Sequence, residues 1–235
     1  MTPLYRLFLR NQLVRGRILG LGVLGLLAVL LGAAVGRSDG ASLRDGAELV
    51  SGYGLSLFVP VTVLVFASAV LGEPNEDGTL VYLWLRPIAR WQMAVAALAA
   101  TLTITLPLVV LPMALCGALA GGDRAGDLAL GATASCTLAA VAYAGLFMWL
   151  GLRVRRALVW GLAYILIWEG FVARAGATPS RLSVRASTRS ILGHVADGPR
   201  DLVELSAWAA VLIPLVAGAV AVVLAVRRLT TQDVA

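Results

Sequence analysis

The sequence predicts an all-α polytopic membrane protein with six transmembrane helices, an N-terminal interfacial helix and a short cytoplasmic surface helix. Of its 235 residues, 60% are hydrophobic and only 14% are charged, which excludes a soluble domain with a single core. Several uncharged apolar runs reach the length of about eighteen residues or more that a helix needs to cross a bilayer. We therefore treat residues 1–235 as one transmembrane domain.

Residues 1–17 are the expected interfacial helix, because apolar and basic side chains alternate there with helical spacing. The apolar side chains can sink into the membrane interface while the arginines stay at headgroup level: Leu4, Leu7, Phe8 and Leu13 against Arg6, Arg10, Arg15 and Arg17. A signal peptide is the alternative, but the basic region is long and GRSDG after the apolar run offers no convincing cleavage site. We expect a retained first span over residues 18–35.

Five further spans are expected at residues 49–71, 91–119, 128–152, 157–173 and 205–226. Prolines lie inside three of these spans and should kink or bend them: Pro60, Pro107, Pro112 and Pro214. The polar connections are a short loop at 36–48, a tight turn at 121–127 and a long extracytoplasmic loop at 174–204. That long loop contains two candidate short helices, at 179–192 and 199–204.

The arginines predict that both chain ends are cytoplasmic. Six spans put the two ends on one side, and with the N-terminus inside, eleven of the nineteen arginines are cytoplasmic. Short loops give the clearest bias, with three arginines in residues 153–156 against one, Arg124, in residues 121–127. Because basic residues favour cytoplasmic loops, we expect a multi-pass protein of the cell (inner or plasma) membrane with both termini inside.

Between the second and third spans, residues 73–90 read GEPNEDGTLVYLWLRPIAR from Gly72 onward and form the most informative polar segment. An acidic turn at residues 73–78 leads to Thr79, a suitable N-cap, and Pro87 ends the short apolar stretch that follows. Leu80, Leu83 and Trp84 would share one face of a helix lying at the membrane surface. A mere connector is the alternative interpretation of such a loop.

The string formed by Glu76, Gly78, Thr79 and Leu80, followed by Pro87, Ile88 and Arg90, resembles the membrane subunits of type-2 ABC transporters, the exporter-type permeases. The resemblance implies that 73–90 is a coupling segment that contacts a separate ATP-binding subunit. It implies these contact residues: Glu73, Glu76, Asp77, Gly78, Thr79, Leu80, Leu83, Trp84, Pro87 and Arg90. Pro74 departs from the family pattern, which leaves both Glu73 and Glu76 as candidates for the carboxylate that touches the partner. The resemblance also implies re-entrant helices in 174–204, and a simple surface loop is the alternative.

All nineteen basic residues are arginines, and the chain contains no lysine. A P-loop needs a lysine to reach the β- and γ-phosphates of ATP, so this chain cannot bind and split ATP in the usual way. We therefore expect no catalytic residue, metal site or cofactor on this chain, with ATP and Mg²⁺ held by the partner subunit. A second permease chain, identical or related, is expected to complete the pathway, in contact with the lipid bilayer and with no nucleic acid.

Few polar side chains lie within the apolar runs. Glu169 is the only carboxylate among them and is a candidate pathway or gate residue, since intramembrane charges are costly. The alternative is that it reaches the outer surface or pairs with Arg174. Thr101 and Thr105 could line a polar groove, although such hydroxyls more often bond their own helix or a neighbour.

The leading hypothesis is the permease subunit of an ATP-driven ABC exporter. An intramembrane lipid-modifying enzyme is an alternative, although the single histidine, His194, and the lack of paired carboxylates within spans argue against it. A membrane scaffold without transport is a third hypothesis.

Overall fold

The computed structural model describes residues 2–38, 42–78, 89–171, 183–198 and 202–231, and all regular structure in these ranges is helical. The long elements are α2 (Arg15–Gly36), α4 (Val59–Glu76), α6 (Arg90–Ala120), α7 (Ala125–Arg153) and α11 (Ala207–Thr231). The shorter ones are α1 (Thr2–Gln12), α3 (Leu43–Leu49), the π-helix η1 (Val50–Phe58), the 3₁₀-helix η2 (Gly122–Arg124), α8 (Ala157–Ala163), the π-helix η3 (Tyr164–Glu169) and α10 (Val184–Val195).

Five helical segments are long and apolar enough to cross a membrane: Arg15–Gly36, Leu43–Glu76, Arg90–Ala120, Gly122–Arg153 and Ala207–Thr231. The 22 residues of α2 extend about 33 Å at 1.5 Å per residue, which matches a hydrocarbon core of roughly 30 Å. These segments make the chain a multi-pass helical membrane protein. The predicted fifth span, 157–173, is described as the shorter apolar helix Ala157–Glu169, so the described residues contain five candidate spans rather than six.

The helices surround α4 and α7. In the candidate span Leu43–Glu76, 78% of the residues in an 18-residue apolar stretch are buried. The corresponding buried shares are 22% in α2 and 28% in α11, so these two helices are peripheral. Small residues let the central helices approach closely: a Cβ at Gly151 of α7 would lie 2.3 Å from the carbonyl oxygen of Ser68 in α4. Gly145 and Gly218 do the same for α7 and α11. Membrane helices pack through such small-residue contacts because the bilayer provides no hydrophobic drive between them.

Several predicted boundaries are wrong by a few residues. The predicted loop 36–48 is partly helical, because Ser42 and Asp45 form a capping box that starts α3 at Leu43. The predicted turn 121–127 is shorter, since α7 already begins at Ala125. Helix α1 ends at Gln12 rather than at residue 17, and Arg15 and Arg17 belong to α2.

The prolines act differently from one another. Pro60 lies in the first turn of α4, directly after the nine-residue π-helix η1. Because proline has no N–H for the preceding turn, it removes one helical hydrogen bond, and the wider π geometry next to it is a local departure from the α-helix at this place. The predicted kink stays a prediction. Pro107, Pro112 and Pro214 lie within the continuous helices α6 and α11.

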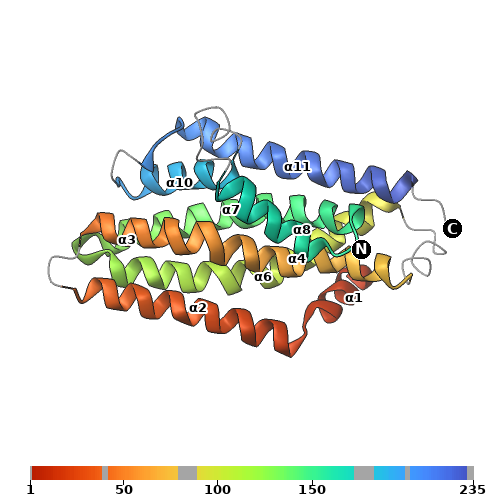
Figure 1. Cartoon of the computed structure of the whole chain (residues 1–235), viewed down its shortest axis with the longest axis horizontal. Helices are drawn as coiled ribbons and strands as arrows, with labels where there is room; N and C mark the ends of the chain where they lie inside the picture. Colours follow the sequence, from red (N-terminus) through yellow and green to blue (C-terminus); the bar gives the residue numbers. More distant parts are fainter. Residues whose placement is uncertain (1, 39–41, 79–88, 172–182, 199–201, 232–235) are drawn as a thin grey trace.

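The two ends of the bundle differ in what they carry. One end of the bundle holds four features: helix α1, the C-terminal end of α4, the junction of α7 and α8, and the C-terminal end of α11 (Figure 1). Helix α10 lies at the opposite end, beside the beginning of α11 (Figure 1). Of the two candidate helices in the long loop, the structure contains α10 over Val184–Val195 instead of 179–192, and residues 199–201 of the other lie outside the described residues.

Candidate functional site

The acidic residues after the second span continue a helix. We predicted a turn at residues 73–78, but α4 runs through Glu76, with Pro74 inside it and Asp77 as its C-cap. Gly78 follows with a φ of 68°, a left-handed conformation that glycine adopts without strain. The remaining predicted contact residues Thr79, Leu80, Leu83, Trp84 and Pro87 lie outside the described residues, and Arg90 begins α6.

Glu73 joins the end of α4 to the beginning of α2. The Arg17 guanidinium donates to one carboxylate oxygen of Glu73 and forms an ion pair with it. The side chains are 28% and 50% exposed, respectively, so solvent weakens the pair and its stabilisation is about 0–1 kcal/mol. Its main effect is therefore positional, because it links α2 to α4 through two residues that are 56 positions apart in the chain.

Glu76 joins the same end of α4 to the junction of α7 and α8. Its carboxylate accepts a hydrogen bond of 2.8 Å from the backbone N–H of Arg156. Arg156 has a φ of 59°, which is uncommon for a non-glycine residue, and it is the N-cap of α8. A negative charge at a helix N-terminus interacts favourably with the unpaired N–H groups there, so Glu76 stabilises this turn.

Asp77 differs from both neighbours. It is exposed, and its side chain forms no hydrogen bond or ion pair with the residues that the structure describes. Of the three carboxylates at the end of α4, two are thus bound within the chain and one is free to meet another molecule. The sequence did not distinguish these roles, because they depend on Arg17 and Arg156, which are distant in the chain.

Helix α1 is held against α6 by polar contacts. Gln12 donates to the Thr101 hydroxyl at 2.9 Å, and the Tyr5 hydroxyl donates to Thr103 at 3.0 Å. Leu4 and Phe8, which we expected to enter the membrane interface, are buried against protein, whereas Leu7 and Leu13 are exposed. Only part of the predicted apolar face is therefore available to lipid.

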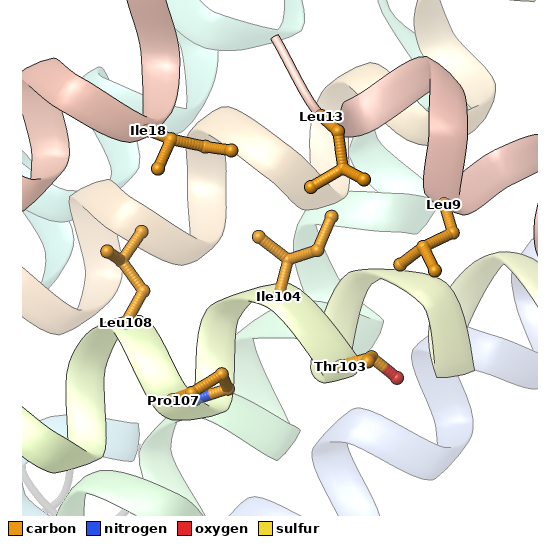
Figure 2. Close-up of a pocket in the computed structure, with 7 residues that line it drawn as sticks. All are labelled: Leu9, Leu13, Ile18, Thr103, Ile104, Pro107 and Leu108. Atoms are coloured by element: carbon orange, nitrogen blue, oxygen red, sulfur yellow. The ribbon is translucent and has the colours of Figure 1, made fainter. Parts of the chain in front are cut away.

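An apolar groove of about 500 Å³ separates α1 from α2 at the corner where the chain turns. Figure 2 shows Leu13, Ile18, Ile104 and Leu108 around this space, with Pro107 and Thr103 below it on α6. Aliphatic packing is thus incomplete at this corner, and α1 is held by the hydrogen bonds of Gln12 and Tyr5 to α6 together with the burial of Leu4 and Phe8.

The carboxylate of Glu169 is buried at the end of η3, where its residue is 2% exposed. It accepts hydrogen bonds from the Ser183 hydroxyl, from the Tyr164 hydroxyl at 3.2 Å and from the backbone N–H of Val184 at 3.2 Å. The backbone N–H of Arg185 is a further, longer donor at 3.4 Å. Since Ser183 is the N-cap of α10, Glu169 binds the N-terminus of that helix, where an anion is favoured.

This arrangement corrects the expectation that Glu169 reaches the outer surface, whereas its pairing with Arg174 stays a prediction. Arg174 lies outside the described residues, and within them the carboxylate is bound by α10. Tyr143 is completely buried, and within the described part of the chain its hydroxyl has no hydrogen-bond partner. Serine is a favoured helix cap, which is the one local signal for Ser183, but no local pattern indicates that Glu169 would bind it.

Thr101 and Thr105 are buried on the face of α6 that meets other helices. Thr105 donates to the backbone carbonyl of Thr101 at 2.9 Å, and the Thr101 hydroxyl accepts from Gln12. Both hydroxyls thus have partners within the chain, and the prediction that they belong to a pathway or gate stays a prediction. Gln12, which the sequence did not single out, is the polar residue that ties α1 to them.

The fold and this site define a class: polytopic helical membrane proteins whose acidic helix end lies between two spans at one end of the bundle. Comparison with known families identifies the particular one. Residues 10–173 match the ABC-2 family transporter protein model, and because this is more than half of the 235 residues, the chain belongs to that family. No protein of curated function matches the chain. The chain is therefore a membrane permease of an ABC transporter, and its family implies association with an ATP-binding subunit.

Proposed function

We propose that the chain is the permease subunit of an ATP-driven exporter and that the end of α4, with residues 73–90, receives force from a separate ATP-binding subunit. One observation carries this proposal: of three carboxylates at the end of α4, Glu73 and Glu76 are bound to neighbouring helices, while Asp77 is exposed and free of partners in the described residues. The two bound carboxylates suit transmission within the chain. The free one suits recognition of another protein.

The proposed mechanism is mechanical. The ATP-binding subunit docks from the cytoplasm on the end of α4 and on the coupling segment 73–90, of which residues 79–88 lie outside the described residues. When ATP draws two such subunits together, the end of α4 moves, and the contacts with Arg17 and Arg156 pass the movement to α2 and α8. Docking can select between two arrangements of the bundle only if their free energies differ by no more than a few kcal/mol. ATP and Mg²⁺ remain on the partner, because this chain has no lysine for a P-loop.

Two permease chains, identical or related, would enclose the pathway in the cell membrane, with both termini in the cytoplasm. The exposed apolar faces of α2 and α11 are available for lipid or for the second chain. At the outer end, Glu169 ties the segment α8–η3 to α10, so that a displacement of α8 would also displace α10. This link supports an outer gate that includes Glu169 and part of the loop 174–204. Thr101 and Thr105 lie on α6, and Thr101 bonds Gln12 of α1 at the other end of the bundle, so we propose them as polar residues of the pathway and not of this gate.

The experiment is co-purification of the chain from its native membrane, followed by measurement of ATP hydrolysis in the isolated complex. We expect a P-loop polypeptide in the complex, and we expect Asp77→Arg to reduce its retention while Asp123→Arg, at the opposite end, has no effect. An Asp77→Arg variant with full retention and full coupled hydrolysis would contradict the proposal. A scaffold would retain the partner without any transport that depends on ATP, and an enzyme would require no partner.

A further inference from the structure

A small polar pocket lies between α1 and the end of α4. It has a volume of about 210 Å³, and we call it the α1–α4 pocket. One wall comes from α1 and the other from α4 and its C-cap, through Phe8, Asn11 and Gln12 on one side and Val70, Glu73 and Asp77 on the other. The pocket therefore joins the N-terminal helix to the helix end that carries the acidic residues.

The polar groups that line this pocket are rich in unused hydrogen-bond acceptors. Gln12 is only 2% exposed, and its Nε2 donates to Thr101 and to the carbonyl of Phe66, but its Oε1 accepts no hydrogen bond from any residue that the structure describes. Pro74 also lines the pocket and has no N–H, so the Val70 carbonyl lacks its usual helical donor. Asp77 adds a free carboxylate, and Arg17 binds one oxygen of Glu73.

Such a set of acceptors selects a ligand that only donates. A guanidinium or an ammonium has several N–H donors and no acceptor, and its aliphatic stem can pack on apolar walls such as Phe8 and Val70. A metal ion is a poorer match, since Ca²⁺ takes about six to eight oxygen ligands. Moreover, the described residues contain no group of three or more histidine, cysteine or carboxylate side chains that could hold a metal.

We propose that the α1–α4 pocket receives an arginine or lysine side chain of the ATP-binding subunit. This inference rests on the proposed function and adds to it the chemical nature of the contact. Among the described residues, the lining carboxylates of Glu73 and Asp77 outnumber the one guanidinium paired with them, that of Arg17, so the pocket favours a cation. A basic side chain seated there touches α1 and α4 at once, and a movement of the partner then carries both helices together.

The test measures the dissociation constant between the permease, in lipid nanodiscs, and the ATP-binding subunit that co-purifies with it. Asp77→Asn removes the exposed charge without changing size. Gln12→Leu removes the unused acceptor and also the Nε2 bond to Thr101, so Thr101→Val, which removes that bond and keeps Oε1, is its matched control and should leave the dissociation constant unchanged. We expect Asp77→Asn and Gln12→Leu each to weaken binding about tenfold, the effect of losing roughly 1.4 kcal/mol of a charge-assisted contact. Asp123→Asn, an equally conservative change at the opposite end, should leave the dissociation constant unchanged.

Charge reversal identifies the partner residue. Asp77→Arg should abolish binding, and one exchange of a basic residue for glutamate in the ATP-binding subunit should restore it. If wild-type chain binds the subunit and Asp77→Asn and Gln12→Leu bind equally well, this inference is wrong while the proposed function stands. If the wild-type chain binds no ATP-binding subunit, the proposed function itself fails. Loss of binding on addition of EDTA, with no nucleotide present, would show a metal ion in the pocket and overturn the inference.

Discussion

The junction between η3 and α10 allows the most detailed prediction. Glu169→Ala removes the acceptor for four donors, of which the Ser183 hydroxyl and the Val184 N–H are the most deeply buried. A buried donor left without a partner costs about 1–3 kcal/mol, so these two together should lower the free energy of unfolding by roughly 2–6 kcal/mol. Glu169→Gln keeps the shape and one acceptor oxygen and should cost less than Glu169→Ala.

Denaturant or thermal unfolding in detergent measures this loss, and amide hydrogen exchange localises it to the first turn of α10. The matched control is Glu48→Ala, which breaks the exposed Arg44–Glu48 pair and should change stability by about 0.5 kcal/mol or less. Our reasoning would be refuted if Glu169→Ala unfolded like the wild type and the amides of Val184 and Arg185 exchanged no faster. That result would mean that α10 is held by its apolar packing on α7 alone.

Three further predictions concern the bundle and its cytoplasmic end. Gly145→Ala should destabilise the chain by about 1–3 kcal/mol, because its Cβ would lie 2.5 Å from the carbonyl oxygen of Gly218. Gly126→Ala is the control, since its Cβ would meet nothing within 4 Å and should not destabilise the chain. Equal melting temperatures for the two variants would contradict this prediction. Glu76→Ala should speed hydrogen exchange at the Arg156 amide, and unchanged exchange would show that the contact is absent in solution. Tyr5→Phe should increase the mobility of a spin label on α1 by removing the bond to Thr103, and an unchanged spectrum would show that Gln12 alone holds the helix.

Apolar run length was sufficient to predict the helical membrane class, because a run such as 18–35 has few alternatives to a spanning helix. Helix ends were harder to predict. Pro74 and the charges after Leu71 suggested a turn, yet α4 continues to Glu76. The helix persists because Glu73 and Glu76 are bound by Arg17 and Arg156, and these tertiary contacts are invisible to a local pattern.

The candidate site was predictable in the same uneven way. The string from Glu73 to Arg90 indicated the correct family, since it is local in the chain, while its role as the contact region stays a prediction. Which of the three carboxylates are bound within the chain and which one is free was not predictable, because this depends on which distant arginine lies nearby. Glu169 illustrates the same limit: its cost within an apolar run was evident, but its partner Ser183 follows a long polar segment whose path the sequence does not determine.

The central claim is that the end of α4 is a cytoplasmic contact for an ATP-binding partner. The most direct test replaces Asp77 with cysteine and attaches a photo-crosslinker there in inside-out membrane vesicles, after Cys116 and Cys136, which are both buried, have been shown not to react. Our account predicts labelling from the cytoplasmic side and a covalent adduct with a P-loop polypeptide. Labelling of residue 77 only from the external side, or an adduct with lipid alone, would contradict it.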